Sequence, residues 1–294
     1  MSWLVPLSFF FVFGTASFLL RRYLAQRIPQ DNALINLVFY VVFLLPVALV
    51  LGLSLPHTFF PGWNAVWLLL AVSAVWPLYF MATFRASKDL DAGILSMITD
   101  MSAFVTLAIS YMVIDERLGL AQLGGVVLLA ISGLLAVWPD IRSKQHAKLG
   151  GILIALMAMV IIGFATFIEK IALNTVQLGT YFLYGWGLQA IWMIIFSYKD
   201  IRRVPAFLRR KKYRNAIFGY GIFGILRSVS FALALLLVAS PTVMNAGSNF
   251  LTVTVLIAAY VILHEKENLG YKIAGALCGL AGLTLLAQPC LFGC

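Results

Sequence analysis

Two charged residues stand inside otherwise apolar stretches, where they could bind a solute. Arg227 lies near the middle of one stretch and Asp100 lies inside another. If these stretches cross a membrane, an ionisable side chain there is costly and is a functional candidate by default. Arg227 would hold a carboxylate or a phosphate through a forked pair of hydrogen bonds, and Asp100 would attract an amino group or carry a coupling proton. The alternative is a structural Asp100–Arg227 ion pair that binds no ligand.

Hydrogen-bonding and aromatic side chains extend this candidate site for a small solute. Asn245 and Asn249 are four residues apart and share one face of a helix, with Ser248 beside them. They would contact the solute or, alternatively, join neighbouring helices. Trp76 and Tyr79 would line an apolar cavity or stack on a ring, or else anchor their helix at the membrane interface.

The motifs of soluble enzymes are missing from the sequence. It contains no Walker loop for nucleotide phosphates and no cysteine spacing of the metal-binding kind, and its three histidines are far apart. We therefore expect no enzymatic activity, no cofactor, no metal site and no ATP hydrolysis. Cys290 and Cys294 near the end of the chain are free thiols or, in an oxidising compartment, a pair.

The composition is that of a membrane protein. Of 294 residues, 62% are hydrophobic and 11% are charged, whereas soluble domains have roughly 45–50% and 25%. A spanning helix needs about 20 mostly apolar residues. Ten stretches meet this condition: 3–20, 33–55, 64–84, 92–114, 118–138, 150–172, 180–198, 216–238, 241–263 and 269–288. The first is interpreted as a spanning helix and not as a removable signal peptide.

Prolines and glycines predict local features of these helices. Pro46 and Pro77 fall inside the second and third stretches, where each is expected to kink its helix. Small residues in the last stretch and in the fifth are expected to let two helix backbones approach closely. These are Gly275, Gly279 and Gly282, with Gly124 and Gly125.

The two halves of the chain are related at a constant offset of 149 residues. Gly14, Ala16, Ser17, Phe18 and Arg21 correspond to Gly163, Ala165, Thr166, Phe167 and Lys170, and Tyr111, Glu116 and Arg117 correspond to Tyr260, Glu265 and Lys266. Each half has five stretches, so the second half must enter the membrane from the opposite side. We expect an all-α protein with ten transmembrane helices in a 5+5 inverted repeat, divided into 1–143 and 144–294. Inverted repeats are common in secondary carriers, whose solute site lies between the halves.

The basic residues predict an orientation. Of 21 Lys and Arg residues, 18 lie in the connections after stretches one, three, five, seven and nine when Lys272, at the start of stretch ten, is included. Eight of these lie between Lys199 and Arg214. The positive-inside rule places these loops in the cytoplasm and both termini outside. Basic residues confined to short loops do not indicate nucleic-acid binding; the run 209–212 is expected to contact anionic lipid headgroups.

In each half, a stretch ends in a Glu-basic pair and the next stretch follows at once. The strings are Ile109-Ser110-Tyr111-Met112-Val113-Ile114-Asp115-Glu116-Arg117-Leu118 and Ala258-Ala259-Tyr260-Val261-Ile262-Leu263-His264-Glu265-Lys266-Glu267. With the duplication, this pattern resembles the EamA-like branch of the drug/metabolite transporter (DMT) superfamily over nearly the whole chain. The resemblance implies export or exchange of amino acids, other metabolites or drugs through a central cavity lined by helices one, three, four, six, eight and nine. The glycine usual before the glutamate is replaced by Asp115 and His264. Ten-helix members have cytoplasmic termini, opposite to the orientation that the basic loops predict.

Glutamates supply further candidates. In the related small multidrug transporters, a glutamate on the first helix couples proton movement to efflux, and Glu169 lies on the repeat equivalent of that helix. Glu169 and Asp100 are therefore the coupling candidates, although Glu169 could instead form a snorkelling pair with Lys170 at a helix end. Glu116 and Glu265 are expected to be structural, as caps or as partners of the adjacent Arg117 and Lys266.

The sequence thus favours a secondary active transporter that moves small metabolites, such as amino acids or related solutes, by alternating access in export or exchange. A lipid-head-group flippase, a membrane-embedded enzyme and a membrane scaffold are the alternatives. The expected partners are a small solute and membrane lipid, and the expected location is the inner (plasma) membrane, with several passes. The oligomeric state stays open, and a monomer is compatible with the sequence.

Overall fold

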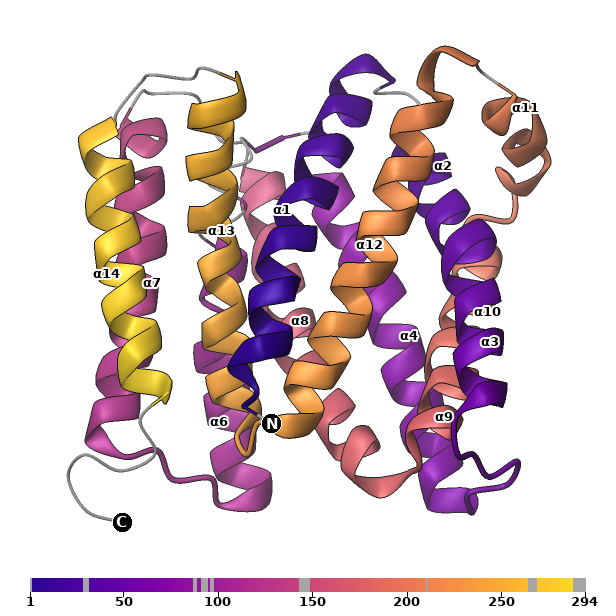
Figure 1. Ribbon diagram of the computed structural model, residues 1–294, viewed down its shortest axis with the longest axis horizontal. Helices are drawn as coiled ribbons and strands as arrows, with labels where there is room; N and C mark the ends of the chain where they lie inside the picture. The colour runs from indigo at the N-terminus through magenta and orange to yellow at the C-terminus, as the bar shows by residue number, and fades with distance from the viewer. Residues whose placement is uncertain are drawn as a thin grey trace.

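A computed structural model of the chain describes residues 2–28, 32–86, 89–90, 95, 98–142, 149–209, 211–263 and 269–287. Within these ranges the chain forms helices joined by short connections, without a β-strand. The long helices run along a common direction, as Figure 1 shows. The fold prediction of an all-helical protein is confirmed for the described residues. The expected boundary between the halves at 143/144, the Glu265–Lys266 pair and the Cys290–Cys294 tail are not among them.

The bounds of the helices follow the apolar stretches. In the first half they are α1 (Leu4–Arg27), α2 (Asn32–Val38), η2 (Phe39–Leu44), α3 (Leu45–Ser54), α4 (Trp63–Ala86), α6 (Ser102–Ile114) and α7 (Leu120–Arg142). In the second half they are α8 (Leu149–Thr175), α9 (Leu178–Thr180), η3 (Tyr181–Trp186), α10 (Gly187–Phe196), η4 (Ile201–Arg203), α11 (Val204–Leu208), α12 (Lys211–Leu237), α13 (Pro241–Leu263) and α14 (Leu269–Ala287). Several helices extend beyond the apolar stretch that predicted them, which changes the position of the charged residues near their ends.

Among the residues that the structure describes, six helical segments are long and apolar enough to cross a membrane. They cover Leu4–Arg21, Ala33–Ser54, Trp63–Ala86, Leu149–Thr175, Leu178–Phe196 and Lys212–Leu237. Shorter apolar helices cover Ile98–Ile114, Leu120–Leu135 and Ile273–Leu286. Helices of this length and composition match the ~30 Å hydrocarbon core of a bilayer. The protein therefore has the helices of a membrane protein.

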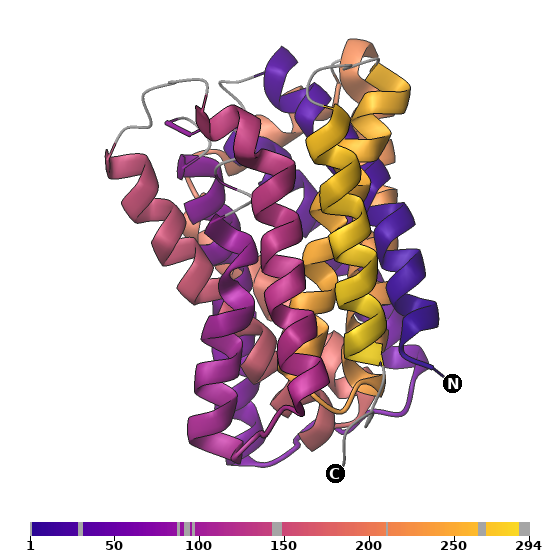
Figure 2. The same ribbon diagram turned by 90° about the vertical axis from the view of Figure 1, so that its left-hand side faces the viewer.

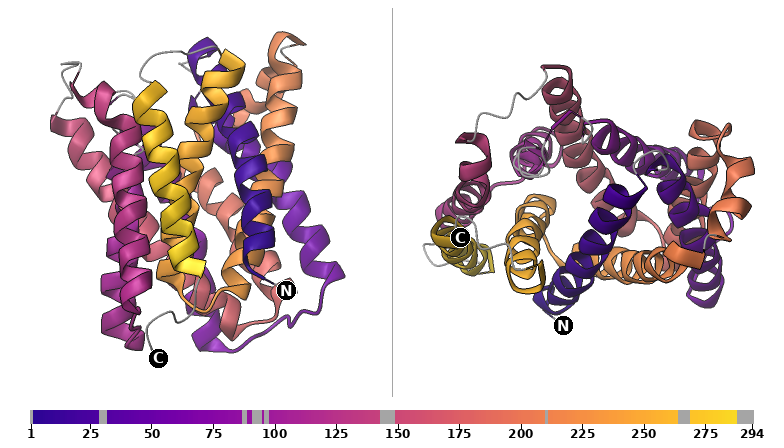
Figure 3. Two further views of the ribbon diagram at one scale, coloured as in Figure 1. Left: turned by 60° about the vertical axis from the view of Figure 1, so that its left-hand side comes forward. Right: turned by 90° about the horizontal axis from the view of Figure 1, so that it is seen from above.

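The bundle is elongated when seen from above (Figure 3), with α7 and α14 at one end. Helix α3 and helix α10 lie at the other end (Figure 1). Helix α1 begins and α14 ends at the same edge of the bundle, whereas α7 ends and α8 begins at the opposite edge (Figures 1 and 2). The site described below lies among α1, α4, η2 and α12.

Wider helical turns replace the simple kink expected at Pro46. Residues Phe39–Leu44 form a π-helix directly before α3, and Pro46 occupies the first turn of α3. A proline lacks the N–H that would bond back to the preceding turn, and a π turn accommodates this loss. Pro77 lies inside α4, which is assigned as one helix from Trp63 to Ala86. A second π segment, Tyr181–Trp186, precedes α10.

The small residues predicted to form packing faces in α7 and α14 lie where these two helices meet. A Cβ added to Gly282 would lie 3.0 Å from the carbonyl oxygen of Gly125, and one added to Gly125 would lie 2.8 Å from that of Gly282. Ser132 on α7 donates a hydrogen bond of 2.6 Å to the carbonyl of Gly275. The close backbone approach predicted for these helices is confirmed. Figure 2 shows the two helices side by side.

The Glu-basic hairpin after α6 is structural, but its pairing differs from the expectation. Asp115 ends α6 in the left-handed region with φ 50°, a conformation that glycine adopts most easily and Asp tolerates. Arg117 pairs with Asp115 at 3.2 Å. Glu116 instead accepts hydrogen bonds from the hydroxyls of Ser240 and Thr242 at the start of α13. Glu116 thus joins the α6–α7 hairpin to the α12–α13 connection.

Candidate functional site

Two arginines from opposite halves of the chain meet at one aromatic ring. The guanidinium carbon of Arg227 on α12 lies 5.9 Å from the centroid of the Phe80 ring on α4, and that of Arg21 on α1 lies 5.8 Å from the same centroid. Arg21 also lies 4.1 Å from the centroid of Phe84. Such contacts are attractive because the ring face carries partial negative charge. The Phe80 ring therefore lies near both guanidinium groups.

The position of Arg21 follows from the length of α1. The apolar stretch ends at Leu20, and the sequence treats Arg21 as the first residue of a basic loop. The helix continues to Arg27, so Arg21 lies more than one turn before its end. The sequence analysis therefore missed this residue. The repeat correspondence between Arg21 and Lys170 was the signal that could have identified it.

Neither arginine is neutralised by the described part of the chain. Neither guanidinium there forms an ion pair or a hydrogen bond, and their contacts are with aromatic rings. Both side chains are partly buried, and two like charges near one ring repel each other. Two guanidinium groups placed in this way can attract an anion.

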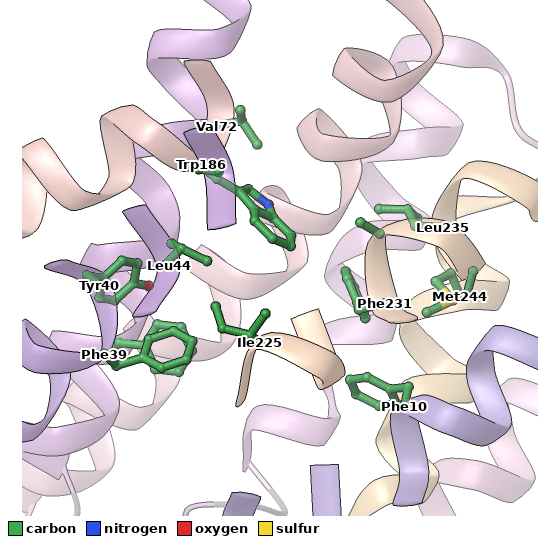
Figure 4. Packing of buried hydrophobic residues seen from close by; sticks show 14 of the residues in the cluster. Phe10, Phe39, Tyr40, Leu44, Val72, Trp186, Ile225, Phe231, Leu235 and Met244 are labelled. Carbon is green, nitrogen blue, oxygen red and sulfur yellow. The ribbon is translucent and has the colours of Figure 1, made fainter. Parts of the chain in front are cut away.

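A buried hydroxyl adjoins the same ring. Tyr40 on η2 is 1% exposed, and its ring lies 5.9 Å from Phe80 in an edge-to-face arrangement. In Figure 4 the Tyr40 hydroxyl points inward, on the side of the ring that faces Leu44. This oxygen has no hydrogen-bond partner among the described residues. Buried hydroxyls are nearly always hydrogen-bonded, so an unpaired one marks a place for a ligand or water.

Two aromatic residues that the sequence analysis selected as candidates also lie next to Phe80. Tyr79 and Trp76 lie on α4, with ring centroids 5.9 Å apart. The centroids of Tyr79 and Phe80 are 5.3 Å apart, and those of Trp76 and Phe80 are 6.3 Å apart. Trp76 also contacts Phe231 on α12, which Figure 4 shows within the packed interior. We refer to Arg21, Tyr40, Tyr79, Phe80 and Arg227 as the arginine–aromatic cluster.

Glu169 is buried next to this cluster, which contradicts the snorkelling alternative. It lies on α8, which continues to Thr175, and its side chain is 2% exposed. The indole N–H of Trp76 donates to Oε2 at 2.7 Å, and the Tyr181 hydroxyl donates to Oε1. A carboxyl held in this way by two donors inside the bundle can bind or release a proton only where water or a solute reaches it. Glu169 keeps its place as the coupling candidate.

Lys170 is also buried, with a structural partner. Its Nζ donates to the carbonyl oxygens of Leu235 at 2.9 Å and Leu236 at 3.1 Å, and the side chain is 6% exposed. These are among the last carbonyls of α12, which have no partner within the helix. A cation at a helix C-terminus is favourable. The Lys170 ammonium therefore binds carbonyls at the end of α12, whereas the guanidinium of its repeat counterpart Arg21 lies near aromatic rings.

Asp100 contacts α7 and α13. An added Cβ on Gly133 of α7 would lie 3.2 Å from Asp100 Oδ2, so this carboxyl faces α7, and the Asp100 carbonyl accepts a hydrogen bond from Asn249. The Asp100–Arg227 ion pair, the alternative interpretation of these two residues, does not occur in the described structure, where Arg227 contacts Phe80.

Asn245 links three helices. Its amide donates to Thr106 on α6 at 2.6 Å and accepts from Ser102 at 3.2 Å, and the Thr106 hydroxyl donates to the carbonyl of Gly163 on α8. Ser248 donates to the carbonyl of Asn245 within α13. Asn245 and Asn249 therefore bond to residues outside α13, as the alternative interpretation expected, whereas the hydrogen bond of Ser248 stays within α13. The structure brings Arg227, Tyr79 and Trp76 together with Glu169, and it places Asp100 and the α13 polar residues with α6 and α7.

No acidic, histidine or cysteine cluster suited to a metal ion occurs among the described residues. The arrangement can hold an anion by charge and hydrogen bonding, and it contains no nucleophile–base pair for covalent chemistry within the cluster.

Comparisons with known proteins identify the fold. No family model matches the chain, and no curated protein sequence matches it. A solved crystal structure of a protein matches it with a TM-score of 0.66 and 14% identity, covering 95% of this chain and 96% of that chain. At this identity the match concerns the fold alone. Nearly the whole chain is therefore similar to a fold that has been determined by crystallography.

Proposed function

We propose that the chain is a secondary active transporter that carries small metabolites across a membrane by alternating access. The observation that carries this proposal is the arginine–aromatic cluster, with Glu169 beside it, on helices long enough to span a membrane. Charged groups inside a membrane-spanning bundle are costly and usually mark a solute or ion pathway. We assign no enzymatic activity to the chain, and any driving force would come from a gradient or from exchange.

The pairing of the helices supports a ten-helix inverted repeat. At the offset of 149 residues, α1 corresponds to α8, α4 to α12, and α7 to α14. Helix α1 packs against α12, and its counterpart α8 packs against α4, while α7 and α14 pack against each other. This is the packing that two similar halves related by a two-fold axis would have. Exchange of conformations between such halves opens a central site to either side.

The proposal extends to family and orientation. We propose membership of the EamA-like drug/metabolite transporters, and a location in the inner (plasma) membrane. The edge of the bundle at which α7 ends and α10 leads into α11 would face the cytoplasm, since the basic connections lie there. Both termini would then face outside.

A flux assay in vesicles tests the proposal. The purified protein, reconstituted into liposomes, should exchange a radiolabelled solute from a panel of amino acids, organic anions and organic cations, with a rate that saturates. Arg227→Ala should abolish this flux while the protein elutes as the same monodisperse species, and Arg85→Ala on the exposed end of α4 should not. Movement of fluorescent lipid with no solute flux would instead indicate a flippase, and no movement of either would exclude a carrier.

A further inference from the structure

We propose that the arginine–aromatic cluster is a binding site for a small organic dianion, such as a dicarboxylate or a phosphate ester, held between Arg21 and Arg227. This inference rests on the proposed transport function and names the substrate class for it. The sequence alone suggested a solute with both an acidic and an amino group, for which Asp100 would supply the negative charge.

The charge balance of the cluster favours a dianion. Two guanidinium groups lie within 5.8 Å and 5.9 Å of one ring centroid, without a carboxylate partner among the described residues. A monoanion would leave one positive charge uncompensated inside the bundle, where such a charge is costly. Two negative charges on one small solute would compensate both.

The nearby carboxyls do not provide that compensation. Both oxygens of Glu169 accept hydrogen bonds from neutral donors, Trp76 and Tyr181. The Asp100 carboxyl lies against Gly133 on α7 and forms no ion pair with either arginine in the described part of the chain. An amino group on the solute would therefore meet positive charge in this cluster, which disfavours cationic and zwitterionic solutes.

The hydroxyl of Tyr40 is the second observation that points to a ligand. It is buried, has no partner among the described residues and belongs to a ring 5.9 Å from Phe80. An acidic oxygen placed between the guanidinium groups would accept the hydrogen bond that this hydroxyl can donate. Charge-assisted bonds of this kind are shorter and stronger than those between neutral groups.

The comparison of the two halves shows that this use of Arg21 is specific to the first half. Its counterpart Lys170 donates to the carbonyls of Leu235 and Leu236 and is committed to packing. Arg21 instead reaches Phe80 and Phe84. The first half thus contributes Arg21, Tyr40 and Phe80 to the site, and the second half contributes Arg227.

Binding to the purified full-length protein tests the dianion site. The probes are succinate and glycerol 3-phosphate as dianions, lactate as a monoanion, alanine as a zwitterion and choline as a cation. At least one dianion should raise the melting temperature, and lactate, alanine and choline should bind at least about tenfold more weakly. Stabilisation by succinate and not by glycerol 3-phosphate would identify a carboxylate site. Stabilisation by glycerol 3-phosphate and not by succinate would identify a phosphate site.

Variants assign the binding to the two arginines. Arg21→Gln and Arg227→Gln should each weaken dianion binding by about tenfold to a hundredfold, the usual effect of losing a charged hydrogen bond. Arg85→Gln, which removes an exposed charge from the same helix as Phe80, should leave it within about twofold. Arg227→Lys keeps the charge and loses the fork, and should give an intermediate affinity even if Arg227→Gln fails to fold.

Failure of this inference can be told apart from failure of the carrier proposal. Saturable exchange of alanine or choline that survives both Gln substitutions would leave a carrier and refute the dianion site. Binding of a dianion that depends on both arginines, with no flux of any solute in vesicles, would leave the site and refute the carrier. Binding of a dianion with equal affinity to wild type, Arg21→Gln and Arg227→Gln would also overturn the inference.

Discussion

Replacing Lys170 by methionine should destabilise the protein by a measurable amount. The ammonium group donates to two carbonyls near the end of α12, at 2.9 Å and 3.1 Å, and the side chain is 6% exposed. Methionine keeps much of the aliphatic stem, so the change removes the charge and its bonds more than the packing.

Two effects of opposite sign set the magnitude. Hydrogen bonds to a charged group contribute ~1.5–3 kcal/mol each, and interaction with the helix dipole adds up to ~2 kcal/mol. Against them stands the desolvation of the ammonium, which is several kcal/mol and is recovered when the charge is removed. The carbonyls of Leu235 and Leu236 would lose their partner, which adds a further cost. The expected net loss is about 1–3 kcal/mol in the free energy of unfolding.

Reversible unfolding by sodium dodecyl sulfate in mixed micelles measures this loss. Lys212→Met on the exposed start of α12 is the matched control and should change the free energy of unfolding by less than about 0.5 kcal/mol. A Lys170→Met protein as stable as wild type, or more stable, would refute the reasoning. It would mean that desolvation of the ammonium outweighs its bonds to the helix end.

Three further predictions concern the hairpins and the helix contacts, all measured by the same titration. Asp115→Gly should leave the free energy of unfolding within about 0.5 kcal/mol of wild type. Asp115→Val should lower it by roughly 1–2 kcal/mol, because a β-branched residue fits the left-handed region poorly. Equal stability of the two variants would contradict this prediction. Glu116→Ala should cost ~1–3 kcal/mol, and a double-mutant cycle with Thr242→Val should give a coupling of at least about 0.5 kcal/mol, with zero coupling showing that the hydrogen bond across the hairpins is absent. Gly282→Ala should cost ~1–3 kcal/mol because of the close approach of α7, while Gly270→Ala, with open space around it, should not destabilise the protein, and a reversed order would refute the packing.

Much of the fold could be predicted because the apolar stretches are long and their flanking residues are informative. Hydrophobicity locates the helices, and the near one-turn spacing of Gly275, Gly279 and Gly282 predicts a face for close helix packing. The position of Arg227 inside an apolar stretch marks it as a candidate without any structure. These signals are local in the sequence, so they need no knowledge of how the helices pack.

The rest of the site depends on packing that a single sequence does not reveal. Arg21 follows directly on an apolar stretch and looks like a loop residue, but α1 continues past it, so the side chain can reach Phe80. Tyr40 is one aromatic residue among many until its hydroxyl is found buried without a partner. Asp100 was one possible partner for Arg227, but its carboxyl lies against Gly133 on α7.

The position of Glu169 also could not be decided from the sequence alone. Near the predicted end of its stretch it could equally snorkel to the surface, and only the longer α8 and the donors Trp76 and Tyr181 place it inside the bundle. The extent of a helix past its apolar stretch decides whether a terminal charge faces solvent or the interior. Here that extension accounts for both Arg21 and Glu169.

The most direct test of a solute pathway is whether water reaches the arginine–aromatic cluster when the protein lies in a membrane. With the three native cysteines replaced by serine, a single cysteine introduced as Tyr79→Cys should react with a membrane-impermeant anionic thiol reagent in proteoliposomes. A dianion that binds the protein should slow this reaction. A cysteine that reacts with a lipid-soluble maleimide, but not with an impermeant reagent on either side of the membrane, would contradict the claim that the cluster lies on a solute pathway.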